Sequence, residues 1–379
     1  MAVVGAVSYG VAMVPTMSRA EALAERLAAT GLDGVPRDVA EVPALDLGVQ
    51  DTGPDGARWA LAQRGADVDL ADPRLATVWT VRGAPHVYRR ADLAGVAAAT
   101  QPFSDADAGK RIYDAAKPLK AAGIGILEAL DTIAGEMRAV TGEPTVKGEV
   151  SRRLAERLPA PYLRQCRPCR AVHLYEMPFR LAALRAALEL RPGSSPPVLV
   201  PVAGLAPARR VPERLDVVRA VLRALGPATP AQVAAYLDAR VDEVRVRWPT
   251  DAVEVEIDGE ARWQLPGSQS GAGPAGPVVR LLGPFDPFLQ LRDRELLVPD
   301  EQRRAELWPV LGRPGAVLVA AGGDVTVAGT WRPQLSGRRL RVRVQPWQRI
   351  AAAVTAAVAE QAERLAATRG ARLTDVVTE

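Results

Sequence analysis

The chain has 379 residues, a length that favours two to four domains over one. Hydrophobic residues make up 48% of it and charged residues 24%, and these near-average globular fractions exclude disorder as the main state. The formal net charge is only +4, so a surface for nucleic acid has to come from local clusters of arginine.

The N-terminal segment MAVVGAVSYGVAMVPTM is apolar, and we expect a strand or a loose arm there. It has no basic residue at its start, and it is too short and too often interrupted by glycine and proline to span a membrane. No later segment reaches the length of a membrane span, so we expect a cytoplasmic protein without membrane contacts.

Residues 1–100 are predicted to form a first winged helix-turn-helix unit. Its expected elements are a helix that ends near Gly31, a second helix from about Pro54 to Arg64, and strands over 77–82 and 85–88. Ser18 and Glu21 have the spacing of a capping box at the start of the first helix, and Thr52 is a suitable N-cap for the second. The two strands would form a wing rich in basic residues.

Residues 101–208 are dominated by helical patterns and form either a second winged unit or a helical connector. A helix after His173 is followed by the turn RPGSSPP and by a strand from Val198 to Val202. A hairpin whose loop is this turn favours the winged unit over the connector.

Residues 209–266 give the clearest local signals. We expect helices over 215–225, 230–237 and 239–248, and strands over 253–257 and 261–265. Gly226 and Pro227 end the first helix, Thr229 caps the second, and Asp258–Gly259 favours a tight hairpin. The order helix, helix, helix, hairpin is that of a winged helix-turn-helix, whose third helix enters a DNA groove.

The last part of the chain begins with the glycine-rich stretch 267–277, predicted to be a flexible linker. Residues 278–379 are predicted to form a small β-rich domain that ends in a helix. Its expected strands are 278–282, 295–298, 316–320, 325–331 and 340–344, and the helix is expected over 348–369. The whole chain is therefore predicted to be an α+β protein of tandem winged helix-turn-helix units with a C-terminal β-rich domain.

Cys166 and Cys169 form a lone C-x-x-C motif. Zinc sites of this type need two further ligands at set spacing, and His173 supplies at most one. We therefore expect no metal and no other cofactor.

Three features have two interpretations each. Arg339, Arg341 and Arg343 would share one face of a strand, which either binds DNA phosphates or is simply solvated. Trp59, next to Arg58 on a predicted helix, either stacks on an unpaired base or packs into its own domain. His86 either contacts DNA from the wing or is a half-buried strand residue bonded to a backbone carbonyl.

Several separated segments resemble one known family. They are LGVQDTGPDGARWALAQRG, VWTVRGAPHVYRRADL, HLYEMPFRLAALRAALEL, LLGPFDPFLQLRDRELLVP and VAGTWRPQLSGRRLRVRV. Together they are similar to the tandem winged-helix proteins that include the interstrand-crosslink DNA glycosylases, over about Ser18 to Trp347. The resemblance implies three winged helices arranged as a C around duplex DNA, a C-terminal β domain, and removal of bulky alkylated purines without a metal.

In these glycosylases the catalytic motif is glutamine, an aliphatic residue, and then glutamine or aspartate. Gln50 matches the first position, whereas Asp51 and Thr52 depart from the second and third. The resemblance implies that Gln50 positions water, with Asp51 as the electrostatic partner of a cation-like sugar and Thr52 offering only a hydroxyl. The alternative is that Asp51 and Thr52 merely cap the following helix.

The leading hypothesis is a DNA glycosylase-like protein that binds double-stranded DNA as a monomer and hydrolyses the N-glycosidic bond of damaged, bulky or alkylated bases. No lysine lies near Gln50 in sequence, so water is the expected nucleophile. The alternative is a non-catalytic DNA-binding protein, either a regulator or a lesion shield. The residues expected to contact DNA are Arg58, Trp59, Arg82, His86, Arg89, Arg90, Arg180, Arg245, Arg247, Arg292, Arg294, Arg332, Arg339 and Arg341.

Overall fold

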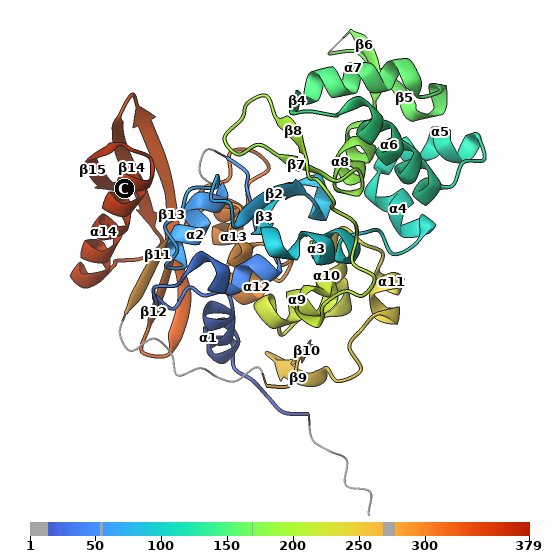
Figure 1. Ribbon diagram of the computed structural model, residues 1–379. Helices are drawn as coiled ribbons and strands as arrows, with labels where there is room; N and C mark the ends of the chain where they lie inside the picture. The colour runs from blue at the N-terminus through green and yellow to red at the C-terminus, as the bar shows by residue number, and fades with distance from the viewer. Residues whose placement is uncertain (1–13, 54–55, 169, 268–276) are drawn as a thin grey trace, which may run out of the picture.

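The computed structural model describes residues 14–53, 56–168, 170–267 and 277–379, which form a mixed α+β protein. The C-terminal sheet and the helix-rich middle segment lie at opposite sides, and N-terminal helices and strands lie between them (Figure 1). The predicted N-terminal arm and the predicted linker fall mostly outside the described residues. No helix in the described ranges is long and apolar enough to cross a membrane.

The N-terminal segment alternates helices with short strands. Its elements are α1 (Arg19–Ala29), β1 (Val49–Gln50), α2 (Gly56–Gln63), β2 (Leu75–Trp79), β3 (Pro85–Arg89) and α3 (Leu93–Ala99). The predicted capping box of Ser18 and Glu21 is present at the start of α1. The strand predicted to reach Arg82 ends at Trp79, because Arg82 lies in a 3-10 turn with a left-handed φ of 59°.

One six-stranded sheet continues from the N-terminal segment into the middle of the chain. Its order is β1-β3-β2-β7-β8-β4, where the last three are β7 (Leu188–Leu190), β8 (Val198–Pro201) and β4 (Thr145–Val146). The predicted hairpin around RPGSSPP is confirmed, since β7 and β8 pair antiparallel. Thr77 of β2 pairs with Leu190 of β7, so the sheet crosses the boundary predicted at residue 100.

Five helices and a small hairpin make up the rest of the middle segment within the described ranges. They are α4 (Asp105–Arg111), α5 (Ala116–Ala121), α6 (Ile126–Val140), α7 (Lys147–Arg157), α8 (Glu176–Arg185), β5 (Leu163–Cys166) and β6 (Ala171–Leu174). Ile126, Leu130 and Ile133 of α6 share one buried core with Leu154 and Phe179. The helical spacing of these apolar residues produces this core.

The third segment confirms the predicted order of three helices and a hairpin. It contains α9 (Val217–Leu225), α10 (Pro230–Leu237), α11 (Val241–Val246), β9 (Val253–Ile257) and β10 (Glu260–Gln264). Thr229 and Gln232 form a capping box at the start of α10. The helix predicted from residue 239 begins at Val241, because Arg240 is extended and is the N-cap residue.

The C-terminal segment is a five-stranded sheet with a long helix packed on it. The sheet order is β11 (Val278–Leu282), β12 (Gly315–Ala321), β13 (Asp324–Ser336), β14 (Arg339–Pro346) and β15 (Arg372–Thr378), and the helix is α14 (Ala352–Thr368). Two predictions are wrong here. Residues 295–298 mostly belong to a short helix, α12 (Arg294–Leu297), which precedes α13 (Glu301–Leu307). The chain also continues past α14 into β15, which pairs parallel with β14.

Two buried ion pairs join the N-terminal and C-terminal segments. Arg26 of α1 pairs with Asp293, and Arg64 after α2 pairs with Asp286 through two hydrogen bonds of 2.8 Å. All four side chains have no exposed surface. A charge that loses its partner in such a setting is costly, so the two pairs hold α1 and the end of α2 against the C-terminal segment.

Candidate functional site

Gln50 lies at the end of the edge strand β1, opposite His86 of β3. Its side-chain amide is held on both sides. Nε2 donates to the Thr52 hydroxyl over 2.9 Å, and Oε1 accepts from Nη2 of Arg82 over 3.0 Å. An amide has two N–H groups and two oxygen lone pairs. Among the described residues no further partner of this amide is found, so one donor and one acceptor remain for a ligand.

Arg82 connects the Gln50 amide to the third segment. Its Nη1 donates to the backbone carbonyl of Tyr236 over 2.5 Å, and its guanidinium carbon lies 4.9 Å from the centre of the Tyr236 ring. The left-handed backbone of Arg82 costs about 1 kcal/mol or more in a residue with a side chain. The strained turn therefore directs one side chain to both Gln50 and α10.

Asp51 and Thr52 both have local partners. Oδ1 of Asp51 accepts from the backbone N–H of Ala57 over 3.1 Å, near the start of α2. Asp51 therefore caps α2, as one of its two interpretations expects, whereas the Thr52 hydroxyl accepts from Gln50. The Asp51 carboxylate is half-buried one residue from Gln50, and its negative charge contributes to the potential there.

His86 and Trp59 are both buried. His86 is 1% exposed, its Nδ1 lies 3.0 Å from the carbonyl oxygen of Ala84, and burial, reinforced by Arg82, lowers its pKa to about 3. Trp59 is 3% exposed, and its indole N–H donates to the carbonyl of Leu281 over 2.6 Å. His86 is a strand residue beside a backbone carbonyl, as one interpretation expected, but it is buried and not half-buried. Trp59 follows the packing interpretation. The expected DNA contacts at these two residues are therefore not available in this conformation.

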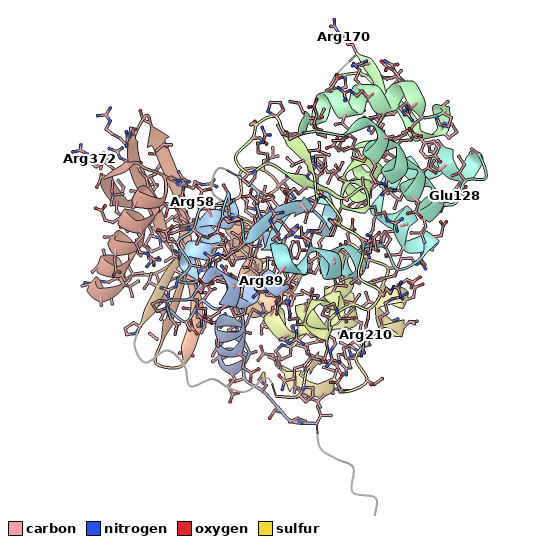
Figure 2. All side chains as sticks on the ribbon, viewed as in Figure 1. Arg58, Arg89, Glu128, Arg170, Arg210 and Arg372 are labelled. Atoms are coloured by element: carbon pink, nitrogen blue, oxygen red, sulfur yellow. The ribbon has the colours of Figure 1, made fainter. Side chains whose placement is uncertain are left out.

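The predicted DNA-binding arginines divide into two groups. Those paired with acids are Arg89 with Asp46, Arg90 with Glu189, Arg180 with Glu176, Arg247 with Glu243 and Arg341 with Asp375. Within the part of the chain that the structure describes, no ion pair is found for Arg58, Arg82, Arg245, Arg292, Arg294, Arg332 and Arg339. Figure 2 shows exposed arginines at separate edges of the view, such as Arg170 and Arg372, so exposure alone does not identify a site.

Four arginines line one hollow and include the partner of Gln50. They are Arg82, Arg292, Arg294 and Arg313, which we call the arginine cluster. Burial, followed by repulsion from the other three guanidinium groups, lowers the pKa of Arg313, so the four charges lie close enough to interact. Arg313 was not predicted, because an isolated arginine between Gly312 and Pro314 carries no sequence pattern.

Arg313 also lines a second cavity, of about 330 Å³, which we call the aromatic pocket. Its wall is formed by Thr52, Gly53, Gly56, Trp59, Gly283, Pro284, Phe285, Arg313, Pro314, Gly315, Trp331, Arg332, Pro333, Leu365 and Arg369. Thr52 belongs to this wall and also binds the Gln50 amide. The pocket, the amide and the arginine cluster are thus connected through Thr52, Arg82 and Arg313.

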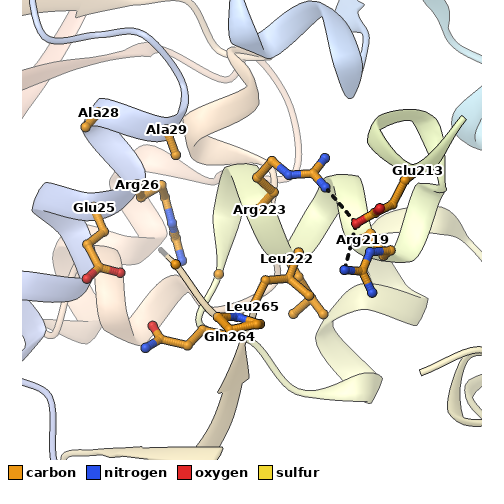
Figure 3. Close-up of a pocket in the computed structure, with 13 residues that line it drawn as sticks. Glu25, Arg26, Ala28, Ala29, Glu213, Arg219, Leu222, Arg223, Gln264 and Leu265 are labelled. Carbon is orange, nitrogen blue, oxygen red and sulfur yellow. Dashed lines mark ion pairs between the residues drawn. The ribbon is translucent and has the colours of Figure 1, made fainter. Parts of the chain in front are cut away.

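Another cavity, of about 340 Å³, lies between α1 and α9 (Figure 3). Its wall contains Glu213, which forms ion pairs with Arg219 and Arg223. None of the residues that line it is a predicted site residue, and its charges already have partners. We therefore place the candidate site at Gln50. No group of three or more metal-binding side chains is found in the described ranges, which omit Cys169.

Comparisons with known proteins agree with the resemblance in the sequence. Residues 44–368 match a family model described as "DNA glycosylase AlkZ-like". Among solved structures, the Streptomyces sahachiroi DNA glycosylase AlkZ matches over 96% of this chain and 100% of its own, with a TM-score of 0.70 and 20% sequence identity. Comparison with curated proteins returned no match. At this identity the structural match establishes a shared fold.

Proposed function

The chain belongs to the AlkZ-like DNA glycosylase family, and from that premise we propose that it binds duplex DNA and hydrolyses the N-glycosidic bond of a damaged, bulky or alkylated base. The observation that carries the proposal is the Gln50 amide, fixed by Thr52 and Arg82 beside the arginine cluster. A polar group held in one orientation is suited to aiming a water molecule.

In this reaction, water attacks C1′ of the sugar while the bond from C1′ to the base breaks, and the electron pair of that bond leaves with the base. Alkylation of a purine nitrogen makes the base cationic, so the base departs as a neutral molecule. The remaining acceptor of Gln50 receives a hydrogen bond from the water, and the charge of Asp51 stabilises the cation-like sugar. The proton released by the water passes to Asp51 and then to solvent.

DNA phosphates in this proposal bind to the arginines without acidic partners among the described residues. The arginine cluster holds the phosphates nearest Gln50, and the contact is extended by Arg58, Arg245, Arg332 and Arg339. A tandem winged-helix arrangement is part of the proposal. The order of elements in the third segment supports it, and α11 with its exposed Arg245 is the helix that would enter a groove.

The test is alkali-sensitive strand breakage of a duplex that carries one N7-alkylated guanine. We expect Gln50→Ala to lower the single-turnover excision rate by about 100-fold or more, the usual effect of losing a positioned polar group. Gln302→Ala is the matched control, because Gln302 is an exposed glutamine on α13. Equal rates for Gln50→Ala and Gln302→Ala would refute the assignment of Gln50.

One observation favours a non-catalytic DNA-binding protein as the second candidate. Oδ1 of Asp51 is committed to capping α2, and Thr52 supplies a hydroxyl where the family motif has an amide or a carboxylate. A regulator or lesion shield predicts saturable duplex binding with intact glycosidic bonds across several N7-alkylated lesions. Base release above the spontaneous rate on any of them would exclude this candidate.

A further inference from the structure

We propose that the loop 309–312, between α13 and β12, is an apolar wedge that enters the base stack of duplex DNA beside the damaged base. This inference rests on the proposed function and adds the way in which the protein opens its substrate. The wedge consists of the side chains of Val310 and Leu311, which are 99% and 85% exposed. They are the two most exposed large apolar side chains among the described residues.

The core next to the loop does not use these two side chains. Leu307 and Trp308, which precede the loop, are buried in one core with Ala316 of β12. A single exposed apolar residue is common on a protein surface and needs no explanation. Two neighbours with almost full exposure form one apolar tip, and the burial of this tip by a partner is favourable.

Both ends of the loop are held in place. Before it, the guanidinium carbon of Arg294 lies 5.0 Å from the centre of the buried Trp308 ring. After it, the guanidinium carbon of Arg313 lies 5.3 Å from the centre of the Phe285 ring. Gly312 ends the loop with a left-handed φ of 65°, which favours glycine. A short loop fixed at both ends loses little conformational freedom when its tip is buried.

The charge next to the loop identifies duplex DNA as the partner. Trp308 and Arg313, on the two sides of the loop, both line the hollow of the arginine cluster. An apolar tip beside several guanidinium groups matches a duplex, because its stacked bases present apolar faces between two anionic phosphate backbones. Leucine is also one of the side chains that DNA-bending proteins insert between base steps.

The arginine cluster also relates the wedge to the proposed reaction. Arg82 lines the same hollow as Trp308 and Arg313, and its Nη2 donates to Oε1 of Gln50. A wedge anchored at this hollow therefore opens the duplex on the side of the residue proposed to aim water. Unstacking costs least at a damaged base, so the wedge also favours damaged over intact DNA.

The test measures the fluorescence of 2-aminopurine, which rises when this base loses its stacking. The probe lies next to 2′-fluoro-N7-methylguanine in a short duplex, because the fluorine slows cleavage of the glycosidic bond. We expect the full-length wild type to raise the fluorescence at saturation, and Val310→Ser/Leu311→Ser to lose most of the rise and to bind about tenfold more weakly. Leu311→Met, which keeps an apolar tip, should retain the rise.

The matched control is Val172→Ser, since Val172 is an exposed valine of β6 to which the proposed function gives no role. Val310→Ser/Leu311→Ser removes no charge, so the dependence of duplex binding on salt should keep its wild-type slope. Both side chains are exposed, so the midpoint of unfolding in denaturant should also stay the same, and a lost signal is then not a folding defect.

Three results would overturn the wedge. They are no rise of fluorescence with the wild type, an equal rise with Val310→Ser/Leu311→Ser, and an equal loss with Val172→Ser. An equal rise would leave the apolar tip to a protein partner instead of DNA. If the wild type unstacks the probe base but excises no alkylated guanine, the proposed catalytic function fails and the wedge stands.

Discussion

Replacing Arg292 by glutamine separates two effects of the arginine cluster, the repulsion within the protein and the proposed attraction to DNA. Arg292 is exposed and has no ion pair in the described ranges, and its charge contributes, after burial, to the lowered pKa of Arg294 and of Arg313. Repulsion between screened, partly exposed charges costs about 0.3 kcal/mol per neighbour. Losing two such repulsions raises the free energy of unfolding of Arg292→Gln by roughly 0.6 kcal/mol.

The same substitution weakens binding to an undamaged duplex. The logarithm of the binding constant falls linearly with the logarithm of the salt concentration, and each phosphate contact adds about 0.9 to the steepness of that line. Arg292→Gln should therefore make the slope shallower by about 0.9. Fluorescence anisotropy between about 50 and 200 mM salt measures it. The control is Arg210→Gln, which removes the same charge from an exposed arginine that is not among the predicted DNA contacts. Equal slopes for the two variants, or a less stable Arg292→Gln, would refute the reasoning.

Two further predictions concern buried groups. Asp286→Ala should lower the free energy of unfolding, measured in denaturant, by about 3–5 kcal/mol, because it leaves Arg64 buried and unpaired. The double variant Arg64→Leu/Asp286→Leu should recover much of this loss. A loss in Asp286→Ala as small as that of the exposed substitution Asp324→Ala would contradict the prediction. The pKa of His86 is about 3, below its ordinary value, so the unfolded chain binds this proton more tightly than the folded protein, and acidification favours unfolding. Stability is unaffected by His86 above pH 6.5 and should fall by up to about 1.4 kcal/mol for each pH unit between 6.5 and about 3. Chemical unfolding at several pH values should show a smaller slope of the unfolding free energy against pH in His86→Gln than in the wild type. Equal slopes in the two proteins would be incompatible with a buried neutral His86.

The fold could be predicted where local signals act on neighbouring residues. The capping box at Thr229, the turn at Asp258–Gly259 and the helical spacing in the third segment each act over a few residues, and the structure contains the expected elements. The strand predicted over 295–298 is wrong because its local pattern is ambiguous. A run of three apolar residues fits the end of a helix as well as a strand. β15 depends on pairing with β14, more than 30 residues earlier, and a local pattern does not predict such pairing.

The sequence predicted which residues belong to the candidate site, but it did not predict how their side chains contact one another. Gln50 and Arg82 are both predicted from the sequence, but their hydrogen bond depends on the left-handed turn of Arg82. Arg64 illustrates the opposite case. It lies at the end of a predicted DNA-binding helix, yet Asp286 pairs with it 222 positions away and buries it. An arginine in the sequence is therefore only a candidate for DNA binding. Whether its charge is available depends on acidic residues far away in the sequence that can pair with it.

In the proposed function, Arg82 links two roles, the aiming of water by Gln50 and the binding of a DNA phosphate. It belongs to a cluster of like charges that repel one another, and its left-handed backbone carries strain. Both features cost stability. The left-handed residue lies in the turn that closes the β2–β3 hairpin, whereas the repulsion between the arginines is not needed to complete the sheet. Repulsion that persists in a folded protein points to a functional demand. In the proposed function, a phosphate placed against the arginine cluster would relieve the repulsion and immobilise the guanidinium that holds the Gln50 amide, so the amide would be most rigid in the complex with DNA.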